Sequence, residues 1–353
     1  MPMTIVANAS TNPYFNIALD AWLVRSAKPG QEYVMLWQNE PAVILGRFQN
    51  TYEEVDVDFA EAHQIAIVRR ISGGGAVYQD LGNMNFSLIA ETRLHPFNDY
   101  EAFTRPVLDT LLEFGVKAEL TGRNDITIEG AKFSGNAQFR SGTHVLHHGT
   151  ILFDEDLEVV PKVLTPPTDK IASKGIKSVR SRVTNVRPHL PPGTTMKDVQ
   201  ERLLHHIGRH NGGIAGTLVI GPDEAAAVDR EVQARFGQWD WNFGASPPFN
   251  FRNRVRFPKG AVEVRLDASH GRIQSAKIYG DFLADRDIGP VEGALVDIPF
   301  SRRSMEEALA QLDVPTYLGG ITGDELLEVL SGLEPRDGEG GDAAPKPPAR
   351  PGS

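Results

Sequence analysis

The sequence predicts an α+β fold, with a large domain built on a mixed α/β core and a smaller C-terminal α+β domain. Strand-like apolar runs alternate with helical patterns through the first two thirds of the 353 residues. A proline-containing break at Ser246–Phe249 then precedes a hairpin pattern and two helical patterns. We therefore expect domains over residues 1–245 and 250–334. The Gly-, Pro- and Ala-rich composition of residues 335–353 predicts a disordered tail.

The first domain should open with a helix that Asn12 caps, that Pro13 begins and that runs to about residue 25. Strand patterns follow at residues 34–37 and 42–45, on either side of a proline-containing turn. The next elements are expected as helices near 55–63, 99–114, 196–210 and 222–236, and as strands at 65–68, 125–128 and 145–153.

Proline and hairpin signals complete the expected elements. Pro106 should kink or divide the helix at 99–114, because proline has no N–H group for the helical hydrogen bond. The second domain should be a hairpin followed by two helices, at residues 261–266, 272–279, 304–312 and 322–333.

Composition limits the classes of function. No apolar run is long enough to cross a bilayer, and the N-terminus has no basic-then-apolar export signal, so a cytoplasmic protein without a membrane partner is expected. The chain has no cysteine, which excludes disulfides and thiolate metal sites. Its formal charge of −10 argues against nucleic acid as a partner, because binding to phosphates requires a basic surface.

The most informative stretch is residues 69–87, RRISGGGAVYQDLGNMNFS. Three glycines leave backbone N–H groups accessible to a ligand, and Arg69 and Arg70 can supply positive charge for a carboxylate or phosphate. The same pattern also suits a tight connection between two strands. The motifs of Walker-type ATPases, dinucleotide-binding folds, zinc hydrolases and serine hydrolases are absent from the sequence.

This stretch resembles the glycine-rich signature of lipoate–protein ligases. Three further blocks resemble that family in the same order, at residues 122–137, 147–153 and 173–185. The similarity extends over nearly all of residues 1–334. It implies a catalytic domain of the biotin/lipoate ligase type, here residues 1–245, and a C-terminal accessory domain, here residues 250–334.

The resemblance implies a reaction in two steps. Lipoate and ATP give lipoyl-AMP, and the lipoyl group then passes to a lysine of an acceptor. The implied acceptors are the lipoyl domains of 2-oxoacid dehydrogenase acyltransferase subunits and the glycine-cleavage H protein. Because the first step brings a carboxylate against an anionic phosphate, the site needs positive charge. Lys132 is implied to bridge the acyl oxygen and the α-phosphate, and Asp125 to position Lys132 or to hold Mg²⁺.

The resemblance also implies a set of residues that bind lipoate and ATP: Trp37, Arg70, Ser72, Gly74, Gly75, Ala76, Val77, Tyr78, Asn83, Lys132, Ala137 and His148. A cationic segment is implied to close over the adenylate, through Lys174, Lys177, Arg180 and Arg182. Gln79 departs from the family pattern, which usually has histidine at that position. Glutamine donates and accepts hydrogen bonds but does not titrate near neutral pH.

Three alternatives remain beside a lipoate–protein ligase. Octanoyl and lipoyl transferases share the fold, but they carry the acyl group on a cysteine, which this chain lacks. Biotin–protein ligases have an arginine- and glycine-rich loop, and this chain has Gly122-Arg123-Asn124-Asp125 instead. The third alternative is a catalytically silent protein that binds lipoate or a carrier domain.

Overall fold

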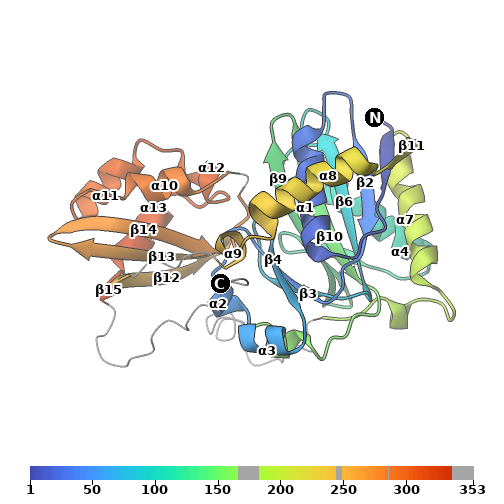
Figure 1. Ribbon diagram of the computed structural model, residues 1–353, viewed down its shortest axis with the longest axis horizontal. Helices are drawn as coiled ribbons and strands as arrows, with labels where there is room; N and C mark the ends of the chain where they lie inside the picture. Colours follow the sequence, from blue (N-terminus) through green and yellow to red (C-terminus); the bar gives the residue numbers. More distant parts are fainter. Residues whose placement is uncertain (166–182, 244–248, 285, 336–353) are drawn as a thin grey trace. The chain divides into compact units, whose positions relative to one another are not determined.

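The computed structural model describes residues 1–165, 183–243, 249–284 and 286–335, and the chain separates into two compact units (Figure 1). The first unit is Met1–Gln238 and the second is Trp239–Ser353. Both combine a sheet with helices, so the predicted mixed α/β fold class is confirmed. Residues 246–248 of the predicted break lie outside the described residues. The same holds for the predicted tail, except for Pro335.

The first unit is built on an eight-stranded mixed sheet in the order β11-β1-β2-β6-β10-β9-β8-β7. Its strands are β1 Met3–Ala7, β2 Tyr33–Trp37, β6 Asn83–Glu91, β7 Glu119–Thr121, β8 Asp125–Ile128, β9 Ala131–Ser141, β10 His144–Leu152 and β11 Ile214–Val219. Strand β1 runs parallel to both of its neighbours, and the other neighbouring pairs are antiparallel. Successive side chains of the central strand β6 point to opposite faces, so Phe86 enters the main core while Asn85 faces the pocket described below.

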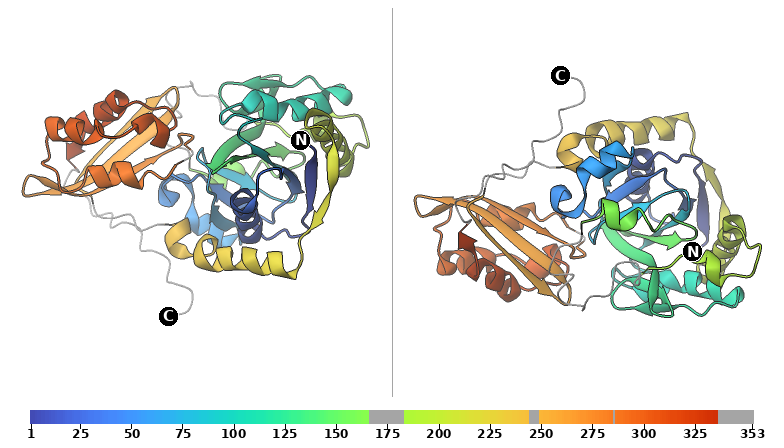
Figure 2. Two further views of the ribbon diagram at one scale, coloured as in Figure 1. Left: turned by 90° about the horizontal axis from the view of Figure 1, so that it is seen from above. Right: turned by 90° about the horizontal axis from the view of Figure 1, so that it is seen from below.

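Helices pack on the sheet (Figure 2). α4 (Tyr100–Glu113) and α7 (Met196–His210) pack against each other and fill the main core with strand residues such as Phe86. α1 (Pro13–Ser26) lies against β10 and β6, and α8 (Pro222–Glu231) packs on α1. A five-residue π-helical turn, η3 Val232–Phe236, continues α8.

Two helix predictions have clear outcomes. Asn12 caps α1 as expected, because its side chain accepts hydrogen bonds from the N–H groups of Tyr14 and Phe15. Pro106 does not divide α4, although it lies inside the helix. The lost helical hydrogen bond costs about 3 kcal/mol. Burial of Phe103, Val107 and other apolar residues on the core face offsets that cost, at roughly 1.5–3 kcal/mol for each large side chain.

A second sheet of three strands, in the order β4-β3-β5, holds the glycine-rich stretch. β3 (Ala42–Leu45) pairs in parallel with β4 (Ala66–Arg69) and antiparallel with β5 (Val77–Gln79). The consecutive strands β2 and β3 therefore belong to different sheets. The helix expected at 55–63 is α3 Val57–Ala62, and a further short helix that was not predicted, α2 Thr51–Glu54, precedes it. The residues between β4 and β5 form a loop, termed here the glycine loop, residues 70–76.

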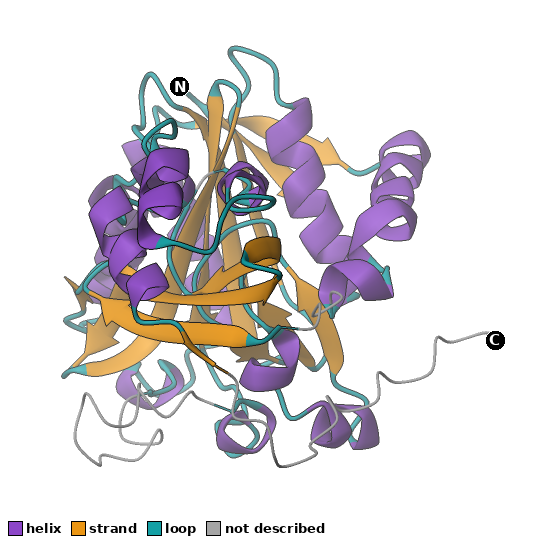
Figure 3. Cartoon of the chain, turned by 90° about the vertical axis from the view of Figure 1, so that its left-hand side faces the viewer, coloured by secondary structure: helices purple, strands orange, loops and turns teal. Residues whose placement is uncertain are grey.

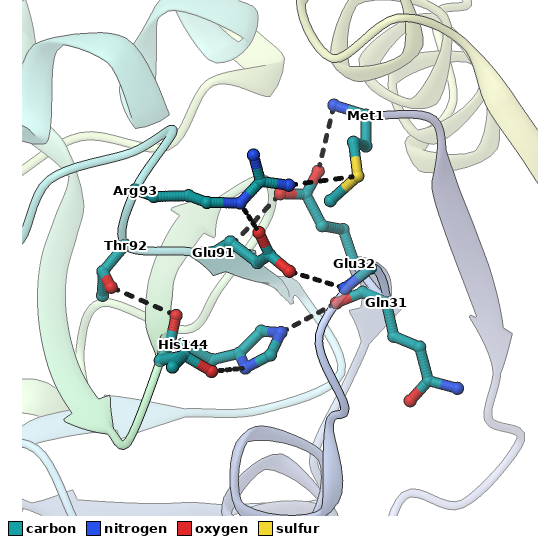
Figure 4. Close-up of polar contacts among 9 residues, drawn as sticks. Met1, Gln31, Glu32, Glu91, Thr92, Arg93 and His144 are labelled. Atoms are coloured by element: carbon teal, nitrogen blue, oxygen red, sulfur yellow. Dashed lines mark hydrogen bonds and ion pairs between the residues drawn. The ribbon is translucent and has the colours of Figure 1, made fainter.

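One end of the eight-stranded sheet is closed by a polar cluster around two buried carboxylates (Figure 4). Glu32 accepts a hydrogen bond from the backbone N–H of Glu91 at 3.1 Å. The carboxylate of Glu91 accepts one from the N–H of Gly30 at 2.5 Å and pairs with Arg93. The hydrogen bonds from Gly30 and Arg93 lower the pKa of Glu91 below its ordinary value. This cluster ties the segment before β2 to the end of β6.

The second unit has a four-stranded sheet in the order β14-β13-β12-β15, with helices packed on it (Figure 3). Its elements are α9 Trp239–Asn242, β12 Phe251–Phe257, β13 Gly260–Ser269, β14 Arg272–Gly280, α10 Gly289–Ala294, α11 Arg302–Leu309, α12 Val314–Tyr317, α13 Gly323–Ser331 and β15 Glu334–Pro335. The predicted hairpin is β13 and β14, and the two predicted helices are α11 and α13. Pro335 pairs with Phe251, so strand structure extends one residue into the predicted tail.

Candidate active site

A pocket opens in the first unit between the glycine loop and strands of both sheets. Residues from α1, β2, β3, β6, β9 and β10 meet there, and the lining combines apolar side chains, carboxamides and one ammonium group. The lining residues are Ile17, Trp37, Ile44, Arg70, Gly74, Gly75, Ala76, Val77, Gln79, Asn85, Asn124, Lys132, Gly135, Asn136, Ala137, His148, Gly149 and Thr150. A concave site with a few polar groups is the usual form of a small-molecule site.

Many of the residues implied by the family resemblance line this pocket: Trp37, Arg70, Gly74, Gly75, Ala76, Val77, Lys132, Ala137 and His148. Ser72, Tyr78 and Asn83 do not line it. Ser72 belongs to the glycine loop but is fully buried, and the Asn83 side chain is buried and donates to Asn85 at 3.1 Å. Burial raises the pKa of Tyr78 far above its ordinary value. Tyr78 lies on the pocket-free face of β5.

Lys132 is the ammonium of the pocket and lies on strand β9, in a segment for which no strand was predicted. Its Nζ atom lies 2.8 Å from Oδ1 of Asp125, on the neighbouring strand β8. The two strands shift register between Ile126 and Thr127. Lys132 keeps about a third of its side chain exposed. The ammonium is thus held in place and still reachable by a ligand.

Gly135 makes room for this lysine. A Cβ atom at position 135 would lie 2.9 Å from Lys132 Nζ and 3.0 Å from Cε, which is closer than Cβ contacts in proteins. Gly149, on β10, is similarly restricted, because a Cβ there would lie 2.2 Å from Oδ1 of Asn136. The two glycines therefore keep this side of the pocket open beside the ammonium.

Arg69 and Arg70 direct their guanidinium groups at the protein itself. Arg70 donates from Nη2 to the carbonyls of Gly73 and Gly75, at 2.6 and 2.9 Å, and from Nη1 to the carbonyl of Ile44 at 3.0 Å. Arg69 donates to backbone carbonyls, including those of Gly46 and Gln49. These buried arginines shape the loop, which differs from the expectation of charge offered directly to a ligand. Burial lowers the pKa of Arg70 to about 10, so it stays charged at neutral pH.

Only one of the three consecutive glycines requires glycine for its backbone angle. Gly74 has φ of +93°, a region that other residues rarely adopt. Close packing imposes a second requirement at Gly46, where a Cβ would lie 1.9 Å from the carbonyl oxygen of Gly74. With the carbonyls of Gly73 and Gly75 bound to Arg70, the conformation of the loop is defined on both sides of Gly74.

Gln79, the departure from the family pattern, belongs to a chain of buried carboxamides. Its Oε1 accepts from Asn39 at 2.8 Å and from Asn85 at 3.1 Å, and its Nε2 donates to Asn85 at 2.8 Å. Asn39 in turn accepts from Asn16 of α1 at 2.9 Å. Gln79 and Asn85 both line the pocket, so part of its wall is polar and carries no titratable group.

His147 and His148 are neighbours on β10 and have different environments. His147 stacks on Phe103 of α4, with ring centroids 4.8 Å apart. Burial and the nearby His148 lower its pKa well below the ordinary value, so His147 is a neutral core residue at neutral pH. His148 faces the pocket and binds Asp20 of α1 and Ser72. No pattern in the sequence pointed to Asp20, because its contact with His148 forms only when α1 packs against β10.

The cationic residues Lys174, Lys177, Arg180 and Arg182 lie outside the described residues. The described residues on either side of this segment are fixed. Thr165 donates its N–H to the carbonyl of Glu54, and Thr184 donates its N–H to the carbonyl of Lys132 at 2.9 Å. The described chain therefore resumes beside the backbone of Lys132.

Within residues 1–165, 183–243, 249–284 and 286–335, no group of three or more His, Cys, Asp or Glu residues could hold a metal ion. No helix in the described part of the chain is long and apolar enough to cross a membrane.

Comparisons with known proteins identify the family of the chain. Residues 12–208 match the model of the lipoyl protein ligase A/B catalytic domain, and residues 246–330 match the model of the bacterial lipoate protein ligase C-terminus. The chain belongs to the lipoate–protein ligase family. The predicted family, and with it the prediction of a ligase, is confirmed.

Individual relatives agree with this assignment over almost the whole chain. The chain is 38% identical to lipoate-protein ligase LplJ of Bacillus subtilis, over 93% of this chain and 100% of that protein. It is 36% identical to lipoate–protein ligase 1 of Staphylococcus aureus, over 92% and 98%. The crystal structure of P. falciparum LipL1 in complex with lipoate has a TM-score of 0.76 and 26% identity, covering 93% of this chain and 98% of that one.

Proposed function

We propose that this lipoate–protein ligase uses ATP to convert lipoate into lipoyl-AMP and then transfers the lipoyl group to a lysine of an acceptor lipoyl domain. The observation that supports this most directly is the Lys132 ammonium, held 2.8 Å from Asp125 in a pocket walled by the glycine loop. A positive charge beside a glycine-rich loop suits the joining of a carboxylate to a phosphate.

In the first step, an oxygen of the lipoate carboxylate attacks the α-phosphorus of ATP, and pyrophosphate leaves. The carboxylate and the α-phosphate are both negatively charged, so the main barrier that the protein can lower is electrostatic. Lys132 would stabilise the charge on the acyl oxygen and the α-phosphate. Asp125 would keep the ammonium from swinging away. The N–H groups of Gly74 to Val77 would hold phosphate or acyl oxygens.

The apolar part of the pocket suits the hydrocarbon chain of lipoate. Ile17, Trp37, Ile44, Val77 and Ala137 contribute apolar surface to the lining. Binding is favoured because this surface and the chain of lipoate are removed from water together. The relative LipL1 of P. falciparum was solved with lipoate bound, which supports lipoate as the acid here.

In the second step, the amine of the acceptor lysine attacks the acyl carbon of lipoyl-AMP. The new C–N bond forms an amide, AMP leaves with the electrons of the broken C–O bond, and the amine loses a proton. Lys132 would stabilise the charge that develops on the acyl oxygen. A relative from Thermoplasma acidophilum, solved as a bipartite ligase system with its E2 lipoyl domain, supports a lipoyl domain as the acceptor; it is 26% identical, with a TM-score of 0.64.

The acceptors we propose are lipoyl domains of 2-oxoacid dehydrogenase acyltransferase subunits and the glycine-cleavage H protein. Lys174, Lys177, Arg180 and Arg182 are proposed to contact the adenylate. For Mg²⁺, Asp125 is the carboxylate that pairs with Lys132 among the described residues, and it would supply an oxygen ligand to the ion. Such an ion would neutralise phosphate charge during adenylation.

The test is mass spectrometry of an acceptor lipoyl domain incubated with the ligase, ATP and lipoate. The expected product is the acceptor with one lipoyl group in amide linkage on its lysine. Omission of ATP and replacement of Lys132 by alanine should each abolish the product. A protein that binds lipoate but modifies no acceptor and releases no pyrophosphate would be a silent binder, and the proposal would be wrong.

A further inference from the structure

A line of four polar side chains runs from the interior of α1 to the glycine loop. The Oδ2 atom of Asp20 lies 2.6 Å from Nδ1 of His148, and Nε2 of His148 lies 2.6 Å from Oγ of Ser72. Oγ of Ser72 accepts a hydrogen bond from Nε of Arg70 at 3.0 Å. These side chains come from α1, β10 and the glycine loop, and all four are buried. We refer to them as the Asp20 relay.

One arrangement of protons satisfies every bond of the Asp20 relay. With a proton on Nδ1, His148 donates to Asp20, and its Nε2 accepts from the hydroxyl of Ser72. The oxygen of Ser72 then accepts from Arg70, whose Nη2 donates to Gly73 and Gly75. Each donor meets one acceptor, so the bonds support one another from the carboxylate to the loop.

The relay resembles the catalytic triad of serine hydrolases, because an aspartate contacts a histidine that contacts a serine. The environment of Ser72 shows that this serine does not act as a nucleophile. Ser72 has no exposed surface and does not line the pocket. A nucleophile must reach its substrate, and its oxygen must be available for attack. The oxygen of Ser72 is instead directed at Arg70.

Burial of the Asp20 carboxylate costs free energy that packing alone does not explain. It is 2% exposed, and within the part of the chain that the structure describes its Oδ1 atom has no hydrogen-bond partner. Burying a carboxylate with a single partner costs more than burying an apolar side chain of similar size. This cost indicates that the carboxylate has a role besides packing. Its hydrogen bond to His148, which lines the pocket, connects that role with the active site.

We infer that Asp20 is a positioning residue for the active site. It fixes the tautomer and orientation of His148, His148 fixes Ser72, and Ser72 fixes the guanidinium that holds the carbonyls on both sides of Gly74. The loop N–H groups are thereby aimed at the pocket before the ligand arrives. Donors that need no reorganisation during the reaction give the largest stabilisation of developing charge.

The experiment compares Asp20→Ala and Ser72→Ala with Glu32→Ala. Glu32 is equally buried, and it closes the far end of the sheet away from the pocket, so it controls for the loss of a buried carboxylate. Two measurements do not need activity. Hydrogen exchange should be at least tenfold faster at residues 73–77 in both relay variants than in the unchanged protein or in Glu32→Ala. The downfield proton resonance of a His148 Nδ1–H bound to a carboxylate should disappear in Asp20→Ala alone.

The kinetic part rests on the proposed function. The rate constant kcat/KM for adenylate formation should fall about 10- to 100-fold in Asp20→Ala, as expected for one lost hydrogen bond to a charged group. The double variant Asp20→Ala/Ser72→Ala should be hardly worse than the poorer single variant, because both changes break the same line of bonds. Glu32→Ala should keep near-normal kcat/KM even if its thermal midpoint falls.

Three results would overturn the inference: unchanged exchange at residues 73–77 in Asp20→Ala, fully additive losses in the double variant, or labelling of Ser72 by a fluorophosphonate. If Asp20→Ala does not fold, Ser72→Ala, which removes one oxygen, provides the exchange and kinetic comparisons. If the unchanged protein forms no lipoyl-AMP, the proposed function fails. The exchange and resonance measurements still decide the relay in that case.

Discussion

At the scale of single residues, the proposed chemistry depends most on Lys132. Replacing it by alanine should remove the positive charge that we propose to stabilise the acyl oxygen and the α-phosphate. Loss of one such preorganised group costs on the order of 3–4 kcal/mol in the transition state, so adenylation and transfer should both fall by about 10²- to 10³-fold. Pyrophosphate release and transfer from supplied lipoyl-AMP measure the two steps. Replacement of the exposed Lys117 is the control, and near-normal adenylation by Lys132→Ala would remove Lys132 from the mechanism.

Gly135 offers a sharper test, because it leaves the lysine in the protein and moves it. In Gly135→Ala the new Cβ would meet Lys132 Nζ at 2.9 Å, and the flexible lysine side chain would shift away from Asp125. Activity should fall at least tenfold while the thermal midpoint stays almost unchanged, since no backbone atom is forced to move. Gly293→Ala adds the same methyl group where no atom lies within 4 Å, and it should change neither quantity. Equal activity of the two variants would show that the ammonium position is not critical.

Gln79 should be difficult to return to the histidine that is usual in the family. The side chain accepts from Asn39 and Asn85 and donates to Asn85, and a neutral imidazole provides only one donor and one acceptor nitrogen. Gln79→His should therefore lower the free energy of unfolding by about 1–3 kcal/mol, the cost of leaving a buried polar group without its partner. Denaturant unfolding measures this change, with the exposed Gln274→His as the control. Unchanged stability would mean that the carboxamide chain rearranges at no cost.

At the scale of elements, the cluster at the end of the large sheet makes stability depend on pH. The pKa of Glu91 is lower in the folded protein than its ordinary value of 4.5. Its ionised form therefore stabilises the fold at pH values above the ordinary pKa, and this contribution is lost as the pH falls through the folded pKa. The unfolding free energies of the unchanged protein and of Glu91→Gln should differ at pH 7, and the difference should shrink as the pH falls through the lowered pKa of the folded state. Glu119→Gln, at the exposed edge of β7, is the control, and a difference that persists in acid would contradict this assignment.

At the scale of the whole molecule, the two units correspond to separate family models, and the pocket lies entirely in the first. We predict that a chain ending at residue 246 still transfers lipoate from supplied lipoyl-AMP but fails with lipoate and ATP. The reason is that the family resemblance associates the C-terminal domain with ATP activation, and domains joined by a short segment can rearrange between steps. Circular dichroism and a cooperative melt must first show that the shortened chain folds. Full-rate activation of lipoate by the folded chain would refute this division.

Local signals in the sequence were sufficient for much of the fold. The cap and proline that begin α1, the pattern of α7 and the turn between β13 and β14 depend on residues close together in the chain, and each element was predicted. Among the strands that were not predicted are β1, β7, β9, β11 and β12. β9 contains glycine, lysine and asparagine, and β11 is an exposed edge, so their strand structure depends on hydrogen bonds to partners far away in the sequence.

The sequence by itself determined the family, because its motifs are recognised from the order of residues along the chain without knowledge of the fold. It also identified Lys132, His148 and the glycine loop as candidates. Only the tertiary structure decided how these groups are held. It turned Arg70 toward the loop carbonyls, placed Gln79 among buried carboxamides and brought Asp20 from α1 to His148 on β10. Asp20 and His148 are separated by 128 positions in the chain. A hydrogen bond depends on distance and direction in space, and for such pairs both exist only after the helices and sheets have packed.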